Sequence, residues 1–247
     1  MKLLLTVAHP DDEAFGCGSV LAHAAASGVE ATVVCATRGE LGEPAPGSGL
    51  EPDVDPVELG RVREAELRDA CALLGVARVE VLDLLDSGMD GDPAPGSLAA
   101  ADPAMVSETL MALIDEIRPD VVVTIGRDDV HRDHVAIGAA TLLAVVRSEH
   151  RPSRTYVWTM GQDLIRRFVG VDGPEFGTPL DLTTTVVDVS RHRELREQAI
   201  RAHASQVPPF DSMSPDLRTE FLEVDRLCRV HPPWTGGPKE DDWVPRD

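Results

Sequence analysis

Short apolar runs alternate along this chain with segments of helical periodicity, and this order constrains the fold more than any other feature. The apolar runs occupy residues 2–7, 31–36, 79–84 and 121–125. Helical stripes follow them at residues 14–27, 58–74, 104–117 and 133–148. Continuous apolar strands that alternate with helices form a parallel sheet covered on both faces, through right-handed crossovers. We therefore predict an α/β fold, a Rossmann-like three-layer sandwich with a mostly parallel sheet.

The last third of the chain continues this pattern less regularly. Strands are predicted at 156–158 and 183–189, and helices at 191–204 and near 215–229. Ser190 is placed to cap the first of these helices. Because no internal repeat or break in composition is present, we expect a single domain over residues 1–247.

The composition excludes several classes of protein. The formal net charge is −20, and no long basic run offers a surface for phosphates, so nucleic-acid binding is not expected. The four cysteines form no CxxC pair, which argues against a cysteine-rich zinc site and favours a reducing, cytoplasmic location. The apolar start is too short for a signal peptide, and no apolar stretch reaches membrane-spanning length, so no membrane partner is expected.

Two polar clusters follow predicted strands. The first, AHPDDE, occupies residues 8–13, and the second, HRDH, occupies residues 131–134. Ligands bind at the carboxyl ends of strands in open α/β sheets, so both clusters can face one crevice. Two histidines and an aspartate with a water molecule match the open geometry of catalytic zinc. Capping of a helix by the first cluster, at about 0.3–1 kcal/mol for each acid, explains one or two carboxylates but not the histidine before them.

Other catalytic motifs are missing or incomplete. Neither GxSxG nor GxxxxGK[ST] occurs, which argues against a serine hydrolase and a P-loop enzyme. Gly16 and Gly18 begin a dinucleotide-binding pattern, but Leu21 stands where the third glycine belongs. Two long Gly/Pro-rich loops, at about 41–57 and 87–103, are expected to rim the crevice. His203 is the one remaining histidine for which a role in the site is considered.

The chain resembles the PIG-L/LmbE-like zinc-dependent N-deacetylases over about residues 2–145. The resemblance rests on AHPDDE after the first strand, TRGELGE at 37–43 and HRDH at 131–134. The segments REAEL at 63–67 and DSGM at 86–89 are similar to the actinobacterial branch, which includes enzymes of mycothiol metabolism. One departure is Arg132, because the family usually has proline there. Arg132 is predicted either to lower the pKa of His131 or to pair with Asp128 or Asp129.

The resemblance implies a role for each matching residue. The metal ligands would be His9, Asp12 and His134. Asp11 would be the general base, His131 would stabilise the oxyanion or act as acid, and Asp133 would tune His131 by raising its pKa. Substrate hydroxyls would contact Arg63, Asp86 and Glu43, and the nearby aromatic residues are Phe15, Tyr156 and Trp158.

From the clusters and the resemblance we predict a hydrolase that removes an N-acetyl or other N-acyl group from a small amino sugar or its conjugate. A Zn²⁺-bound water would attack the amide, and Fe²⁺ is an alternative metal because such ligand sets accept several divalent ions. Two other functions stay open: a Mg²⁺-dependent phosphoesterase and a non-catalytic sugar-binding domain. The sequence leaves open the natural substrate, the pathway, the native metal and the oligomeric state.

Overall fold

The computed structural model describes residues 1–126, 129–169 and 176–244. In these residues one sheet has seven strands in the order β3-β2-β1-β4-β5-β7-β6. Their bounds are β1 Lys2–Val7, β2 Glu30–Cys35, β3 Arg78–Val81, β4 Val121–Thr124, β5 Arg154–Trp158, β6 Thr185–Asp188 and β7 Val224–His231. Strands β1 to β5 pair in parallel, whereas β7 is antiparallel to both β5 and β6. The predicted α/β fold with a mostly parallel sheet is confirmed.

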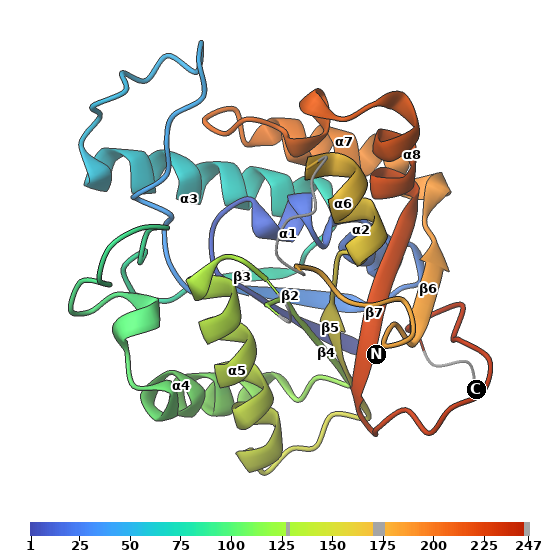
Figure 1. Ribbon diagram of the computed structural model, residues 1–247. Helices are drawn as coiled ribbons and strands as arrows, with labels where there is room; N and C mark the ends of the chain where they lie inside the picture. Colours follow the sequence, from blue (N-terminus) through green and yellow to red (C-terminus); the bar gives the residue numbers. More distant parts are fainter. Residues whose placement is uncertain (127–128, 170–175, 245–247) are drawn as a thin grey trace.

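Helices cover both faces of this sheet, which gives three layers (Figure 1). On one face lie α1 Asp12–Phe15, α2 Gly18–Ala26, α3 Pro56–Leu73, α6 Gln162–Val169, α7 Arg193–Ala202 and α8 Pro215–Glu223. On the other face lie α4 Pro103–Ile117 and α5 Arg132–Arg147. Aspartates cap α3 and α4, because Asp55 accepts from the amides of Val57 and Glu58, and Asp102 accepts from that of Ala104. No helix among the described residues is long and apolar enough to cross a membrane.

The centre of the sheet is apolar around β1, and three threonine hydroxyls beside it bond to one another. Leu3, Leu4 and Leu5 of β1 are completely buried, as expected for a strand covered on both faces. Thr6 is also buried, and its hydroxyl lies 2.8 Å from those of Thr124 and Thr141. Because these hydroxyls bond to one another, they fix β1, β4 and α5 together without leaving a buried polar atom unpaired.

The strand order reverses direction at β1 and β4, and this reversal creates the crevice. From β1 the chain continues outward through β2 and β3, and β4 then returns to the opposite side of β1. The loops that follow β1 and β4 therefore diverge at their carboxyl ends, which is where ligands bind in open α/β sheets. AHPDDE and HRDH both begin there.

The sequence-based predictions differ from the structure mainly near the C-terminus. Residues 224–229, predicted as the end of a helix, form most of β7. Arg226 and Arg229 have helical spacing, but pairing with strands on both sides decides the conformation. The predicted helix 14–27 is divided into α1 and α2, and α6 was missed. Ser190 begins a 3-10 turn, and His192 occupies the N-cap of α7.

Candidate active site

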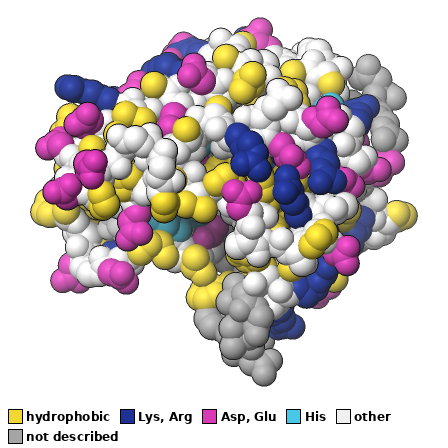
Figure 2. Space-filling view, turned by 90° about the horizontal axis from the view of Figure 1, so that it is seen from above, with side chains coloured by type: hydrophobic (Ala, Val, Ile, Leu, Met, Phe, Trp, Pro, Cys, Tyr) yellow, Lys and Arg dark blue, Asp and Glu magenta, His cyan; other side chains and the backbone are white. Residues whose placement is uncertain are grey.

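A cavity of about 530 Å³ lies at the carboxyl ends of β1 and β4. Figure 2 shows histidine side chains in a hollow of this face, with acidic and hydrophobic side chains around it. The lining includes most of the site residues predicted from the sequence: His9, Asp11, Asp12, Glu43, Arg63, Asp86, His131 and His134. Both long loops contribute to its rim, as expected, through Leu41, Gly42, Gly88, Met89 and Asp90. The two clusters therefore face one cavity.

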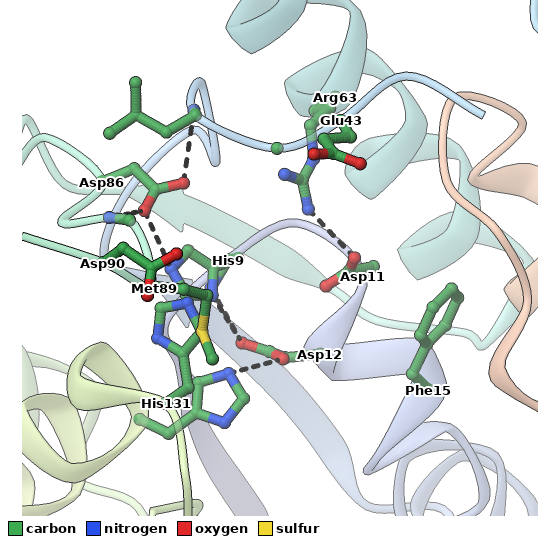
Figure 3. Close-up of a pocket in the computed structure, with 14 residues that line it drawn as sticks. His9, Asp11, Asp12, Phe15, Glu43, Arg63, Asp86, Met89, Asp90 and His131 are labelled. Carbon is green, nitrogen blue, oxygen red and sulfur yellow. Dashed lines mark hydrogen bonds and ion pairs between the residues drawn. The ribbon is translucent and has the colours of Figure 1, made fainter.

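Asp12 lies between His9 and His134 (Figure 3 labels His9 and Asp12). One carboxylate oxygen, Oδ1, is 3.1 Å from Nε2 of His134, and the other, Oδ2, is 3.6 Å from Nδ1 of His9. Each imidazole also contacts a second carboxylate through its other nitrogen. Nε2 of His9 is 3.1 Å from Oδ2 of Asp133, and Nδ1 of His134 is 2.9 Å from Oδ2 of Asp129.

This arrangement matches the way proteins orient imidazole ligands of a metal. A ligating histidine usually donates its outer N–H to a carboxylate or carbonyl, which fixes the tautomer and directs the other nitrogen at the ion. Asp133 and Asp129 are placed to do this for His9 and His134. The contact of Asp129 with His134 was not predicted, because only the position of Asp129 near HRDH could have indicated it.

Two groups of side chains bring possible ligand atoms within 4.8 Å of one another, and neither includes Asp12. One is His9, His131 and His134, and the other is His9, Asp86 and Asp133. In the second group, Asp133 already accepts the Ser87 amide at 2.9 Å and faces Nε2 of His9. His9 belongs to both groups, and Asp12 lies beside His9 and His134, so this part of the cavity could hold a metal ion.

The carboxylates around His9 and His134 favour positive charge on these two imidazole rings. Burial lowers the pKa of His9, but hydrogen bonds with Asp12 and Asp133 outweigh it and raise this pKa to about 9. Burial likewise opposes protonation of His134, whereas Asp12 and Asp129 raise its pKa to about 11. Without a metal, two imidazolium rings supply the positive charge that these acids require. A divalent cation can replace those protons.

Asp11 has an unusual backbone conformation. Its φ is 123°, a region that residues other than glycine rarely adopt. Its amide donates to Oε2 of Glu13 at 3.0 Å, and its Oδ2 accepts from Nη2 of Arg63 at 2.9 Å. Burial raises the pKa of Asp11 and Arg63 opposes it, so that the pKa reaches about 6. Asp11 is thus ionised at neutral pH and remains basic enough to take a proton.

Glu13 and His203 form a buried pair behind Asp11. Nε2 of His203 lies 2.6 Å from Oε1 of Glu13, and both side chains are completely buried. Burial lowers the pKa of His203, but the Glu13 carboxylate outweighs it and raises this pKa. His203 thus reaches the site through Glu13, a connection across 190 residues that no local pattern could indicate.

His131 is oriented by the start of α5. Its Nδ1 accepts from the Asp133 amide at 3.2 Å, so the neutral ring carries its proton on Nε2. Burial and the nearby His9 and His134 lower its pKa. Asp133 does raise the pKa of His131, as predicted, but burial, His9 and His134 outweigh its effect. The Asp133 carboxylate hydrogen-bonds to His9 instead.

The three predicted substrate contacts occupy different environments. Arg63 is buried and donates to the carbonyls of Gly39 at 2.6 Å and Pro10 at 2.7 Å as well as to Asp11. A Cβ at Gly39 would lie 2.4 Å from the Arg63 guanidinium, which explains a glycine there. Asp86 accepts from the amides of Leu41 and Gly88, and Glu43 is exposed at the rim.

The remaining nearby residues divide between the rim and the core. Nη1 of Arg132 donates to the Gly91 carbonyl at 2.8 Å, while Asp128, one of its predicted partners, lies outside the described residues. Phe15 lines the cavity, and Tyr156 is completely buried in the sheet. Tyr156 therefore does not provide a stacking surface for a substrate.

Residues 4–145 match the PIG-L family, described as GlcNAc-PI de-N-acetylase. This chain belongs to the PIG-L family. It is 35% identical over 255 residues to the 1D-myo-inositol 2-acetamido-2-deoxy-alpha-D-glucopyranoside deacetylase of Mycolicibacterium vanbaalenii, covering 94% of this chain and 88% of that protein. The resemblance inferred from the three motifs is confirmed.

Solved structures of more distant proteins share the fold. N,N'-diacetylchitobiose deacetylase from Pyrococcus horikoshii superposes with a TM-score of 0.70 at 20% identity, covering 93% of this chain and 83% of that one. A 4-carboxy-2-hydroxymuconate hydratase from Pseudomonas putida gives 0.67 at 18% identity, covering 96% and 99%. Because a deacetylase and a hydratase share the fold, the chemistry has to be argued from the site.

Proposed function

We propose that this protein is a metal-dependent amide hydrolase that removes an N-acetyl group from an amino sugar conjugate. The observation that carries the proposal is the position of Asp11, a carboxylate with a pKa near 6, beside a group of ligands that fits a divalent cation. The deacetylase relatives, named for an inositol-linked 2-acetamido sugar, support the same substrate class.

His9, Asp12 and His134 would hold the metal. Two imidazoles and one carboxylate suit Zn²⁺, and Fe²⁺ also accepts this set. Mg²⁺ prefers oxygen ligands, so the donor atoms favour an amide hydrolase over a Mg²⁺-dependent phosphoesterase. When bound, Zn²⁺ supplies Lewis-acid polarisation of the carbonyl and lowers the pKa of water toward about 7.

The protein side chains would then perform the proton transfers. Asp11 accepts a proton from the attacking water, and its pKa near 6 allows it to return that proton to the leaving amine. His131, neutral and protonated on Nε2, donates a hydrogen bond to the oxygen on which negative charge develops. Loss of such a donor typically lowers the rate roughly 100–1000-fold.

The polar side of the cavity would bind the sugar. Asp86 and Glu43 offer carboxylates for hydroxyl groups, and Arg63 fixes Asp11 while lining the same wall. The volume of about 530 Å³ is within the range of small-molecule sites. A disaccharide-sized conjugate is therefore the expected substrate.

The test is release of free amine and acetate from N-acetylglucosamine linked to inositol, with N-acetylglucosamine as the simpler substrate. Asp11→Asn should abolish turnover and retain metal, whereas Asp69→Asn, which alters an exposed carboxylate of α3, should leave activity unchanged. Full activity in Asp11→Asn would exclude Asp11 as the base. Binding of the sugar without hydrolysis by the metal-loaded protein would favour the sugar-binding alternative.

A further inference from the structure

A second cavity, of about 270 Å³, adjoins the active site. It shares Asp12, Phe15 and His134 with the polar cavity, so the two meet at the residues assigned to the metal. Figure 3 shows Phe15 beyond Asp12, on the side away from Asp86 and His131. The rest of its wall is largely aromatic side chains and methionines: Trp158, Met160, Phe168, Met213 and Phe221.

The polar side chains that line this second cavity contact one another or form hydrogen bonds with residues outside it. Asp129 holds His134, and Asp12 faces the same ring. The indole N–H of Trp158 donates to Asp225 at 3.3 Å. The described wall thus offers apolar contact and few hydrogen bonds for hydroxyl groups, which disfavours a sugar there and favours a hydrocarbon group.

An amide substrate has an amine part on one side of the carbonyl and an acyl group on the other. One cavity is polar, which suits a hydroxylated amine, and the other is apolar, which suits an acyl chain. With the carbonyl beside Asp12 and His134, a hydroxylated amine faces the polar cavity, where Asp11 can protonate it. The acyl group then extends in the other direction, past Phe15. We propose that the apolar cavity binds the acyl chain and that the enzyme hydrolyses N-acyl groups longer than acetyl in addition to the acetyl group. This inference rests on the proposed amide hydrolysis and specifies its acyl substrate.

The size of the cavity supports a chain of several carbons. One water molecule takes about 30 Å³ in the liquid, so an acetyl methyl group would fill only a small part of 270 Å³. Burial of one methylene contributes about 0.8 kcal/mol, which corresponds to roughly a fourfold gain for each carbon that enters the cavity.

The experiment compares N-acetyl-, N-butyryl-, N-hexanoyl- and N-octanoylglucosamine with the metal-loaded enzyme. We expect kcat/KM to rise by about 2–4-fold per methylene over the first additions and then to level off or fall when the cavity is full. Met213→Trp, which fills the cavity, should reduce the ratio of hexanoyl to acetyl kcat/KM at least tenfold. Met160→Trp provides a second variant if the first does not fold.

A matched control places the same bulky side chain elsewhere. Val146 on α5 is 70% exposed, and Val146→Trp should leave the chain-length profile unchanged. Hydrolysis of the acetyl substrate with steadily lower rates for longer chains would overturn the acyl assignment and leave the proposed function intact. If kcat/KM instead rises when an octyl aglycone is added to N-acetylglucosamine, the cavity binds the aglycone and the acyl assignment is overturned. No hydrolysis of any amide would overturn the proposed function and this inference with it.

Discussion

Replacement of Asp11 by asparagine should stabilise the metal-free protein. The pKa of Asp11 is about 6 in the folded protein and 3.8 for the ordinary side chain, and burial is the main cause. The folded protein therefore holds this proton more tightly than the unfolded chain does. The stabilisation from that proton is complete below about pH 4 and is lost as the pH rises through 6.

The magnitude follows from the difference between the two pKa values. A pKa of about 6 in place of 3.8, at about 1.36 kcal/mol for each tenfold change in proton affinity, means that ionised Asp11 costs about 3 kcal/mol at pH 7–8. The cost is about half as large at pH 5. Asparagine has a similar shape without this charge, so Asp11→Asn should raise the free energy of unfolding by up to these amounts.

The assay is urea denaturation after treatment with a chelator, at pH 5 and at pH 8. Asp69→Asn, which alters an exposed carboxylate, is the control and should change stability little at either pH. An Asp11→Asn protein that is equally stable or less stable than the wild type at pH 8 would show that the ionised Asp11 carboxylate does not destabilise the folded protein. If Asp11→Asn raises the free energy of unfolding equally at pH 5 and pH 8, the ionisation of Asp11 is not the cause of the difference.

Three further substitutions test how the site is held. His203→Asn should lower kcat roughly 10–100-fold with little change in KM, because Glu13 then no longer holds Asp11 in place; a change in KM alone, measured in steady-state assays, would contradict this. Asp129→Asn should weaken metal binding about 10–100-fold in a chelator competition, and unchanged affinity would argue against its role behind His134. Gly126→Ala should cost more than about 2 kcal/mol in urea denaturation, because its Cβ would lie 1.8 Å from the His134 carbonyl. Gly47→Ala, with positive φ and nothing within 4 Å, should cost less, and equal losses would exclude the steric cause.

The first 145 residues could be read from the sequence because local pattern and tertiary structure agree there. Strands such as β1 are buried on both faces and are therefore continuous apolar runs. The first cluster follows β1 directly and the second follows the loop after β4, so the topology brings them to the same edge of the sheet. Family motifs then identified the residues of the cavity.

The contacts between distant residues could not be predicted in this way. The pair between His203 and Glu13 joins α7 to α1, and neither residue carries a periodic signal. The partner of Asp133 proved to be His9 and not its neighbour His131, because the start of α5 directs this carboxylate toward β1. Residues 224–229 form a strand only because β5 and β6 pair with them.

Metal-dependent amide hydrolysis is tested most directly by the metal dependence of amine release. The protein would be stripped with a chelator, reconstituted with Zn²⁺ or Fe²⁺, and assayed on inositol-linked N-acetylglucosamine while bound metal is measured. We expect one metal ion per chain, hydrolysis that returns in proportion to bound metal, and no hydrolysis by metal-loaded Asp11→Asn. Undiminished hydrolysis by the stripped protein would show that the reaction needs no metal. Metal binding that survives loss of both His9 and His134 would show that these residues do not hold the metal.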